Sequence, residues 1–377
     1  MAGNYPFKIL ITADTLGGVW TYSLELIKAL EPYYVEVSLA TMGAPLNSQQ
    51  HQDLASLSNV KLYESSYKLE WMENPWDDVN KAGEWLLKLN KKINPDLIHL
   101  NNFAHGHLPW GKPVLVVAHS CVLSWWEAVK GEEAPPNWDT YRKCIAKGLH
   151  GADIVVAPSK DMLRSVERLY GPFLNKRVIY NGRNPFLFQS GEKEEFIFSM
   201  GRIWDEAKNI SLLTSIASQI PWPIYLAGEN KPPANGKAMN PKNVIFLGQL
   251  SQPKVCEWLS KASIYVLPVK YEPFGLSLLE AAMSRCAIVA GKTESLVEIW
   301  KDAATFVDQQ DPEALLSAIL NLIENGLFRK IIAGEVYNRS LRYTSHRMGA
   351  EYFETYMNLL MRNNTFYSTK KELILGL

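Results

Sequence analysis

Cysteine is scarce in this chain of 377 residues, and the few cysteines lie far apart. None of them belongs to a C-x-x-C pair: they are Cys121, Cys144, Cys256 and Cys286. Zinc sites and disulfide frameworks normally need closely spaced cysteines. The histidines His105 and His107 also lack a nearby third ligand. We therefore predict reduced, mostly buried thiols and no metal site.

Long apolar runs are missing as well. The longest, residues 113–123, is broken by His119 and Ser120 and falls far short of the roughly 20 residues that span a bilayer. The first residues lack the apolar core of a signal peptide, so we expect a cytoplasmic protein. Three lysines of a predicted helix, Lys88, Lys91 and Lys92, would allow peripheral contact with the inner face of a membrane. A solvated helix face explains these lysines more simply.

Neither sign of charge dominates. Lysine and arginine total 39 residues, as do aspartate and glutamate, which removes the electrostatic argument for nucleic acid as a partner.

A chain of this length exceeds the roughly 250–300 residues at which a single core stops growing. With 47% hydrophobic residues and no biased tract, the composition predicts a globular protein of two domains.

Short apolar runs alternate with longer amphipathic stretches along the whole chain. Predicted strands of the first half are 7–13, 35–40, 96–100, 114–118, 154–157 and 177–180, and those of the second half are 196–200, 224–227, 244–247, 264–267 and 287–290. The first helix, 19–30, follows the glycine turn Gly17-Gly18. Such alternation is typical of an α/β fold with parallel sheets covered by helices on both faces.

This pattern predicts two Rossmann-like domains. Turn residues cluster at 181–185 and polar residues at 189–195, so we expect an N-terminal domain over 1–185, a linker over 186–195 and a C-terminal domain over 196–347. A last segment, 348–377, begins with helical periodicity. Ligands of such sheets bind at the carboxyl ends of the strands.

The strongest motif, Y-E-P-F-G-L-S-L-L-E at 271–280, follows the predicted strand 264–267. Gly275 has no side chain to hold a ligand away, and the amides of 276–278 would form a helix N-terminus that attracts an anion such as a pyrophosphate. Glu280, further along that helix, can accept hydrogen bonds from both hydroxyls of a ribose. Glu272 would lie in the preceding loop, nearer an attached sugar.

A second motif, G-R-I-W-D-E-A-K at 201–208, directly follows the first strand of the second half. Arg202 and Lys208 would bring two cations to the carboxyl edge of that sheet. They can neutralise the charge that grows on a diphosphate leaving group, which a metal ion does in other enzymes. The chain lacks a D-x-D triplet. These motifs therefore predict a nucleotide-sugar site that needs no metal cofactor.

The E-P-F-G-L-x-x-L-E motif, preceded by Gly-Arg-(x)5-Lys and by a glycine turn in the first domain, resembles the retaining glycosyltransferases of family 4, which have the GT-B fold. The similarity spans nearly the whole chain. It implies an interdomain cleft, a donor-binding C-terminal domain and an acceptor-side N-terminal domain. It also implies a C-terminal helix that crosses back to the N-terminal domain.

The resemblance also implies residue roles. Arg202 and Lys208 would bind the donor pyrophosphate, Glu280 the ribose, and Glu272 the donor sugar, which His119 would also face. Further donor contacts are implied, many through the backbone, at Gly17, Gly18, Gly228, Gly248, Gln249, Leu250, Phe274, Gly275, Leu276 and Ser277. The motif departs from the commoner pattern in the spacing of Arg202 and Lys208 and in the residues between them, Trp204-Asp205-Glu206.

Each of these residues also has a structural explanation. Taken alone, Glu272 and Glu280 would more often cap helices or face solvent, Arg202 could form a structural ion pair, and His119 could be a hydrogen-bonded core histidine. Gly17 and Gly18 could be ordinary turn residues. The combination of motifs favours the functional interpretation over these alternatives.

We therefore expect a retaining, metal-independent hexosyltransferase of polysaccharide biosynthesis. The favoured donor is UDP-glucose, with GDP-mannose second, and the acceptor is a saccharide or a lipid-linked sugar. The alternatives are a nucleotide-sugar epimerase of the same fold and a non-catalytic nucleotide-sugar-binding subunit. A dehydrogenase is disfavoured because Gly17-Gly18 lacks the third glycine of G-x-G-x-x-G.

Overall fold

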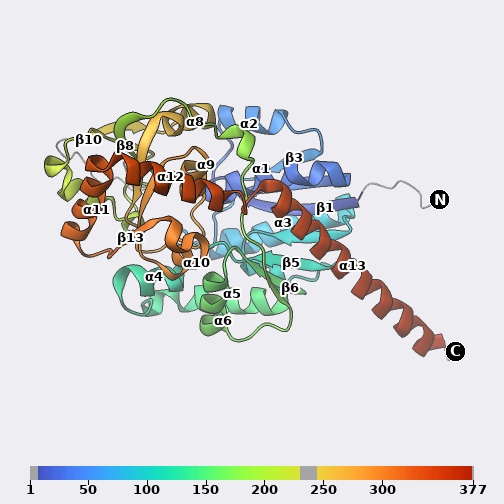
Figure 1. Cartoon of the computed structure of the whole chain (residues 1–377). Helices are drawn as coiled ribbons and strands as arrows, with labels where there is room; N and C mark the ends of the chain where they lie inside the picture. Colours follow the sequence, from blue (N-terminus) through green and yellow to red (C-terminus); the bar gives the residue numbers. More distant parts are fainter. Residues whose placement is uncertain (1–6, 230–243, 376–377) are drawn as a thin grey trace. The chain divides into compact units, whose positions relative to one another are not determined.

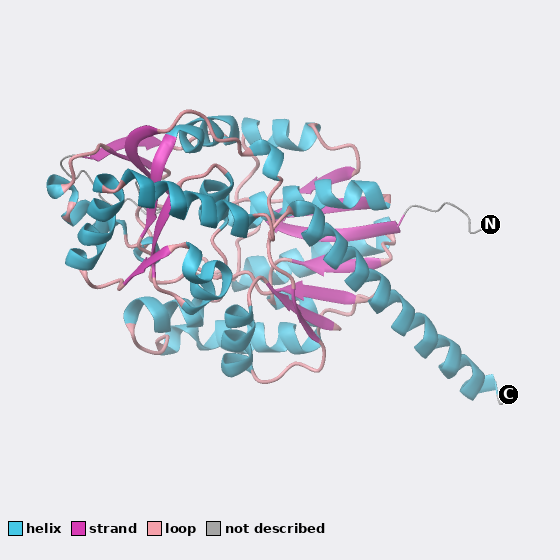
Figure 2. Ribbon diagram, in the orientation of Figure 1, coloured by secondary structure: helices cyan, strands magenta, loops and turns pink. Residues whose placement is uncertain are grey.

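The strands of the chain pair in two separate parallel sheets (Figure 2). The computed structural model describes residues 7–229 and 244–375, with side chains up to residue 362. Contacts divide the described residues into two units. Unit 1 holds the chain up to Ser124, Ala134–Tyr180 and the chain from Ser345 onward, and unit 2 holds Trp125–Glu133 and the described part of Asn181–Thr344.

Unit 1 is built on a seven-stranded sheet in the order β3-β2-β1-β4-β5-β6-β7 (Figure 1). Its strands are β1 (Phe7–Asp14), β2 (Val35–Met42), β3 (Val60–Glu64), β4 (Leu97–Leu100), β5 (Val114–Val117), β6 (Ile154–Ala157) and β7 (Lys176–Val178). The central strands are buried along nearly their whole length rather than at alternate residues, because helices cover both faces of the sheet. The parallel strands β1 and β4 are direct neighbours, and the order in which strands are added along the sheet changes direction between them.

The helices of unit 1 connect these strands. They are α1 (Gly18–Leu30), α2 (Ser48–Ala55), α3 (Trp76–Ile93), α5 (Asp139–Gly151), α6 (Lys160–Tyr170) and α13 (Ser345–Leu375), with short 3-10 helices η1 (Glu31–Tyr33), η2 (Ala104–His107) and η3 (Pro136–Trp138). Helix α4 (Val122–Lys130) follows β5, and its residues from Trp125 onward group with unit 2.

Unit 2 repeats the plan with six strands in the order β10-β9-β8-β11-β12-β13. They are β8 (Glu194–Met200), β9 (Ile224–Ala227), β10 (Val244–Gly248), β11 (Ala262–Leu267), β12 (Ala287–Gly291) and β13 (Thr305–Val307). The connecting helices are η4 (Pro185–Leu187), η5 (Glu206–Lys208), α7 (Ile210–Ser215), η6 (Ala217–Gln219), α8 (Gln252–Lys261), α9 (Leu276–Met283), α10 (Glu294–Trp300), η7 (Lys301–Ala303), α11 (Pro312–Glu324) and α12 (Gly326–Ser340). Here the strand order changes direction between the neighbouring parallel strands β8 and β11.

The predicted α/β fold with two Rossmann-like sheets is confirmed. Two short strands escaped prediction, β3 and β13, and both lie at the edge of a sheet. An edge strand is covered less completely than a central one, and β3 is half-buried or exposed along its whole length. Its sequence V-K-L-Y-E therefore lacks the continuous apolar run that marked the central strands.

The C-terminal helix α13 returns to unit 1 and packs against α1 (Figure 1). Gly349 allows close approach, because a Cβ atom there would lie 2.7 Å from the Cβ of Ala29. Tyr352 and Tyr356 are fully buried, and Phe353 stacks on Tyr33 with ring centroids 4.5 Å apart. The predicted return of this helix to the first domain is confirmed, while residues 376–377 of the predicted segment lie outside the described residues.

None of the helices in the described parts of the chain is both long and apolar enough to cross a membrane.

Substitution of Gly148 tests the packing that positions the loop after β4. A Cβ atom on Gly148 in α5 would lie 1.9 Å from the carbonyl oxygen of Phe103, so Gly148→Ala must push the two backbones apart. We expect a loss of about 3 kcal/mol in the free energy of unfolding, measured by urea denaturation. The matched control is Gly334→Ala in α12, where no atom lies within 4 Å and alanine should add about 0.5–1 kcal/mol. Equal effects of the two substitutions would contradict this account.

Candidate active site

The two motifs of the C-terminal half meet at the carboxyl ends of β8 and β11. Strand β8 ends at Met200, two residues before Arg202, and β11 ends at Leu267, five residues before Glu272. These strands are neighbours at the position where the strand order changes direction along the sheet. Doubly wound folds bind their ligands at this position. Helix α9 begins directly after Gly275, whose φ of 88° lies in the left-handed region that glycine adopts without strain.

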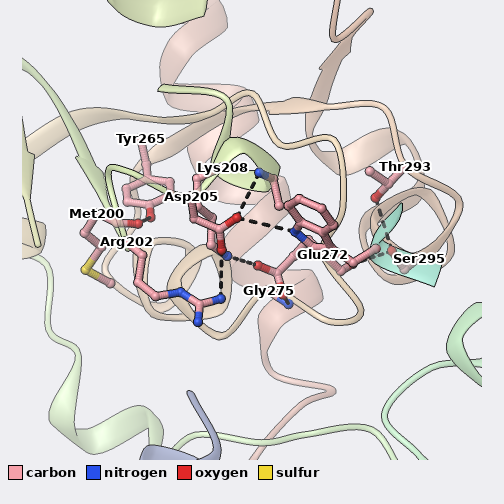
Figure 3. Close-up of polar contacts among 11 residues, drawn as sticks. Met200, Arg202, Asp205, Lys208, Tyr265, Glu272, Gly275, Thr293 and Ser295 are labelled. Carbon is pink, nitrogen blue, oxygen red and sulfur yellow. Dashed lines mark hydrogen bonds and ion pairs between the residues drawn. The ribbon is translucent and has the colours of Figure 1, made fainter. Parts of the chain in front are cut away.

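Lys208 and Glu272 form an ion pair at this edge (Figure 3). The Lys208 Nζ lies 2.6 Å from the Glu272 Oε2, and both side chains are mostly buried. The second carboxylate oxygen, Oε1, accepts a hydrogen bond from the Gly275 amide at 3.0 Å. The Glu272 carbonyl accepts another from the Ser295 hydroxyl. Glu272 therefore joins the lysine motif to the start of α9, and both of its carboxylate oxygens have partners.

Arg202 pairs with an acidic residue of its own loop. Its guanidinium donates to the Asp205 Oδ2 at 2.8 Å, while the Asp205 Oδ1 accepts from the Ala207 amide at 3.0 Å (Figure 3). Asp205 is buried, whereas 46% of the Arg202 side chain is exposed. The buried carboxylate thus anchors a cation that remains open to a ligand. The Arg202 guanidinium also lies 5.6 Å from the centre of the Trp204 ring.

The part of α4 that groups with unit 2 supports the same loop. The Trp125 indole nitrogen lies 3.4 Å from the Asp205 Oδ1, and the Lys130 Nζ pairs with Glu206 at 2.6 Å. The sequence motifs gave no indication of this role for Trp125. Its contact with a residue 80 positions away follows from the fold and not from any local pattern.

Glycines shape the adjoining loops. A Cβ atom on Gly228 would lie 1.8 Å from the Gly201 carbonyl oxygen, so only glycine lets the loops after β8 and β9 touch. Gly248, at the end of β10, has φ 68° and is exposed, as is Gln249, whereas Leu250 is half-buried. These residues lie at the carboxyl edge of the sheet, where the sequence predicted them. Their contacts with a donor stay predictions.

The first turn of α9 contributes mainly backbone. Phe274 is only 2% exposed and packs edge-on against Tyr343, so its side chain belongs to the core. Leu276 and Ser277 are half-buried, and their amides belong to the first turn of the helix. A ligand at this place would therefore meet backbone N–H groups and the Ser277 hydroxyl, an arrangement that suits an anion.

Glu280 forms a buried ion pair that the sequence did not predict. Its Oε1 lies 2.8 Å from the Arg183 Nε, and the two side chains are 7% and 5% exposed. Arg183 also donates to the Gln252 side chain at 2.8 Å and lies against the Phe188 ring. Glu280 is thus held on the inner side of α9 by a residue of the segment 181–185, which sequence reasoning treated as a turn. A local pattern could not reveal a pairing across 97 positions.

In unit 1, His119 follows β5 and belongs to a hydrogen-bonded cluster. Its Nε2 lies 2.9 Å from the Asn101 Oδ1, and the Tyr22 ring packs edge-on against the imidazole with centroids 4.4 Å apart. Burial, with a smaller contribution from His99, lowers the pKa of His119 to about 3. The imidazole is therefore neutral at physiological pH and cannot act there as a cation.

Gly17 and Gly18 form an exposed turn between β1 and α1. Gly17 has φ 75°, and a Cβ atom on it would meet no other atom within 4 Å, so backbone conformation and not packing requires glycine. This turn lies at the carboxyl edge of the unit 1 sheet, as does His119. The functional roles of all three residues stay predictions.

Histidines 105 and 107 have structural partners. The His105 Nε2 lies 2.8 Å from the Val79 carbonyl and its Nδ1 lies 3.1 Å from the Asn102 amide nitrogen, while the His107 Nδ1 lies 2.8 Å from the Ala104 carbonyl. Across residues 7–229 and 244–362, no three histidine, cysteine or carboxylate side chains are grouped as metal ligands.

Two family models together match most of the chain. The one described as Glycosyltransferase Family 4 matches residues 16–185, and the one described as Glycosyl transferases group 1 matches residues 183–339. The chain belongs to the family 4, group 1 glycosyltransferases.

Curated relatives of this glycosyltransferase share modest identity with it. The lipopolysaccharide core biosynthesis mannosyltransferase LpcC of Rhizobium leguminosarum is 36% identical over 20% of this chain and 22% of its own length. The D-inositol 3-phosphate glycosyltransferase of Nocardioides is 24% identical over 30% of this chain and 25% of its own length. The chain thus matches only about a quarter of the length of these two relatives. The uncharacterized glycosyltransferase MJ1607 of Methanocaldococcus jannaschii is 22% identical over 87% of this chain and 89% of its own length.

Solved structures show the same fold. Sucrose-phosphate synthase from Thermosynechococcus elongatus superimposes with a TM-score of 0.80 at 19% identity and covers 94% of this chain and 100% of its own. Anabaena HepE in complex with UDP-glucose has a TM-score of 0.72 at 17% identity, over 93% of this chain and 99% of its own. The glycosyltransferase therefore has the GT-B fold.

Sequence reasoning missed two buried carboxyl groups in unit 1 of the glycosyltransferase. Asp14 ends β1, and the Glu70 carboxylate accepts hydrogen bonds from the amides of Phe103 and Ala104, which follow the neighbouring strand β4. Burial, and then the nearby Glu70, raises the pKa of Asp14 to about 8, while burial raises the pKa of Glu70 to about 7. The final aspartate of a strand carries no local signal of such burial.

The raised pKa of Asp14 predicts how stability depends on pH. In the unfolded chain Asp14 loses its proton near pH 4, whereas the folded protein keeps it up to about pH 8, so this group lowers stability as pH rises across that interval. Asp14→Asn cannot ionise. Between pH 5.5 and 8.5 we expect the variant to gain at least about 1.4 kcal/mol of unfolding free energy relative to the unmodified glycosyltransferase.

Urea denaturation at several pH values measures this difference. The matched control is Asp77→Asn, which makes the same chemical change on the exposed face of α3. Identical slopes for Asp14→Asn and the unmodified protein would show that Asp14 is ionised in the folded state.

Proposed function

We propose that this glycosyltransferase transfers a hexose with retention of anomeric configuration and without a metal ion. The favoured donor is UDP-glucose, and the acceptor is a hydroxyl of a saccharide or lipid-linked sugar in polysaccharide biosynthesis. The observation that carries the proposal is the grouping of Arg202, Lys208 and Glu272 beside the first turn of α9. Two cations and a helix N-terminus at one sheet edge suit a diphosphate.

Each residue then has a role set by its chemistry. Arg202 and Lys208 would bind the pyrophosphate, and the amides of 276–277 would complete its shell. Glu280, held in place by its pairing with Arg183, would accept hydrogen bonds from the ribose hydroxyls. Glu272 would contact the sugar, together with His119. The C-terminal Rossmann-like domain, 196–347, would thus hold the donor and the N-terminal domain, 1–185, the acceptor.

The mechanism that fits these groups is displacement on one face of the sugar. The bond between the anomeric carbon and the phosphate oxygen breaks, the acceptor oxygen bonds to that carbon, and the acceptor proton passes to the departing phosphate. Growing charge on the phosphate is met by Arg202 and Lys208. Glu272 is a poor candidate for a nucleophile, because both of its oxygens are already engaged.

The choice of UDP-glucose is supported by structural neighbours. HepE was solved with UDP-glucose and with UDP and glucose. The mannosyltransferase relative keeps a mannose donor such as GDP-mannose as the second choice, and its role in lipopolysaccharide core synthesis supports a saccharide or lipid-linked acceptor. We propose that the reaction takes place in the cytoplasm.

Calorimetric titration tests the donor site. We expect micromolar binding of one nucleotide among UDP, GDP and ADP without added metal. Arg202→Gln, Lys208→Gln and Glu280→Gln should each weaken binding about 10- to 100-fold, the range for one charged hydrogen bond. The matched control is Lys254→Gln, which removes an exposed lysine of α8 that pairs with Glu257. Absence of binding by every nucleotide and its glucose or mannose conjugate would refute the donor site. Consumption of donor without any acceptor would instead favour an epimerase.

Intact-protein mass spectrometry tests the role of Glu272. The enzyme is mixed with the donor that binds in calorimetry, quenched in acid and weighed. We expect the mass of the unmodified chain, because the proposed displacement forms no bond to the protein. A hexose adduct that is absent in Glu272→Gln would replace this mechanism with a double displacement through Glu272.

A further inference from the structure

His119 belongs to a cluster of hydrogen bonds in unit 1 whose donors and acceptors can be assigned. Asn101, which follows β4, is its centre: its Oδ1 lies 2.9 Å from the His119 Nε2 and 3.1 Å from the His99 Nε2. Its Nδ2 lies 2.7 Å from the Thr12 carbonyl oxygen and 3.2 Å from the Ser23 hydroxyl. Asn101 and His99 are buried, so water does not replace these contacts.

The carbonyl of Thr12 fixes the direction of the whole set. A backbone carbonyl can only accept a hydrogen bond, so the Asn101 atom beside it must be the amide nitrogen. The opposite atom is then the amide oxygen, which can only accept. Both imidazole nitrogens that touch it, the Nε2 atoms of His119 and His99, must therefore carry a proton.

A neutral imidazole has one N–H, so the Nδ1 of each ring is bare. For His99 this agrees with its second contact, because the Tyr356 hydroxyl of α13 lies 2.7 Å from the Nδ1 and can donate to it. Burial keeps the pKa of both histidines near 3, in agreement with neutral rings. For His119, no protein atom among the described residues is hydrogen-bonded to the Nδ1.

We infer that Asn101 is a positioning residue that holds His119 in the tautomer with Nε2 protonated, so that its Nδ1 presents only a lone pair to the substrate. The group that meets it must donate a hydrogen bond. A neutral sugar hydroxyl can do so, whereas the carboxylate of a uronic acid would place a second lone pair against the first. The choice of a neutral hexose over a uronic acid rests on the proposed function, but the tautomer does not.

Nitrogen-15 NMR of the full chain, without ligand at pH 7, tests the tautomer. Long-range proton–nitrogen spectra distinguish a protonated from a bare imidazole nitrogen, and His119→Gln identifies the signals among the seven histidines. We expect a neutral His119 with the proton on Nε2. A proton on Nδ1, or on both nitrogens, would overturn the inference whether or not the protein transfers sugar.

Two variants separate the role of Asn101 from general support of the cluster. Asn101→Leu removes the acceptor, so the Nε2–H signal should shift and a population with Nδ1 protonated should appear. Tyr356→Phe removes a buried hydrogen bond of the same cluster but leaves Asn101 in place, so the His119 tautomer should stay unchanged. Equal responses to both variants would assign Asn101 a merely structural role. If Asn101→Leu does not fold, the spectrum of the unmodified protein decides.

Donor analogues test the consequence for the substrate. Replacing one sugar hydroxyl at a time by fluorine removes a donor, and one such analogue should lose about tenfold in kcat/KM with the unmodified enzyme but not with His119→Ala. A nucleotide-linked uronic acid should be rejected by a larger factor. Equal rates for all fluorinated donors and for the uronic acid would refute the claim about the substrate. Failure to turn over any nucleotide sugar would refute the proposed function and leave the NMR result standing.

Discussion

The constraint on which this structure depends is the common direction of the strands in each sheet. In a parallel sheet every strand must be followed by a crossover, and all carboxyl ends therefore lie at one edge. That edge collects loops from distant parts of the sequence, such as the ones that carry Arg202 and Glu272. Because β8 and β11 are neighbours in the sheet, the loops that follow them meet, and Lys208 of one loop pairs with Glu272 of the other.

Buried charge is the second organising feature, and each unit handles it differently. Unit 2 compensates its buried carboxylates with cations: Arg183 pairs with Glu280 and Lys208 with Glu272. Removing one partner of such a pair would leave the other charge buried and unpaired, at a cost of about 3–5 kcal/mol in stability. The ion pairs therefore hold these side chains in place without a ligand. In unit 1, desolvation instead favours the neutral forms of Asp14 and His119, because it raises the pKa of the carboxyl group and lowers the pKa of the imidazole.

Much of this could be predicted from the sequence, because local patterns encode it. Continuous apolar runs located the central strands, and Gly275 before an apolar helix located the start of α9. Pairings between distant residues could not be predicted, since the motif around Glu280 contains no information about Arg183. The edge strand β3 escaped for a related reason, because a half-covered strand needs no continuous apolar run.

The two strategies for buried charge suit two kinds of ligand group. A phosphate carries its charge permanently and is best met by cations already held in place, as Arg202 is held by Asp205. A sugar hydroxyl carries no charge and is best met by a neutral group with one defined donor or acceptor. A histidine with a pKa near 6.5 would alternate between a charged and a neutral form. The lowered pKa of His119, which lies beside Asn101, keeps its imidazole neutral. The lowered pKa keeps this imidazole from acting as a cation, and the proposed role of Asn101 would leave its Nδ1 as a hydrogen-bond acceptor.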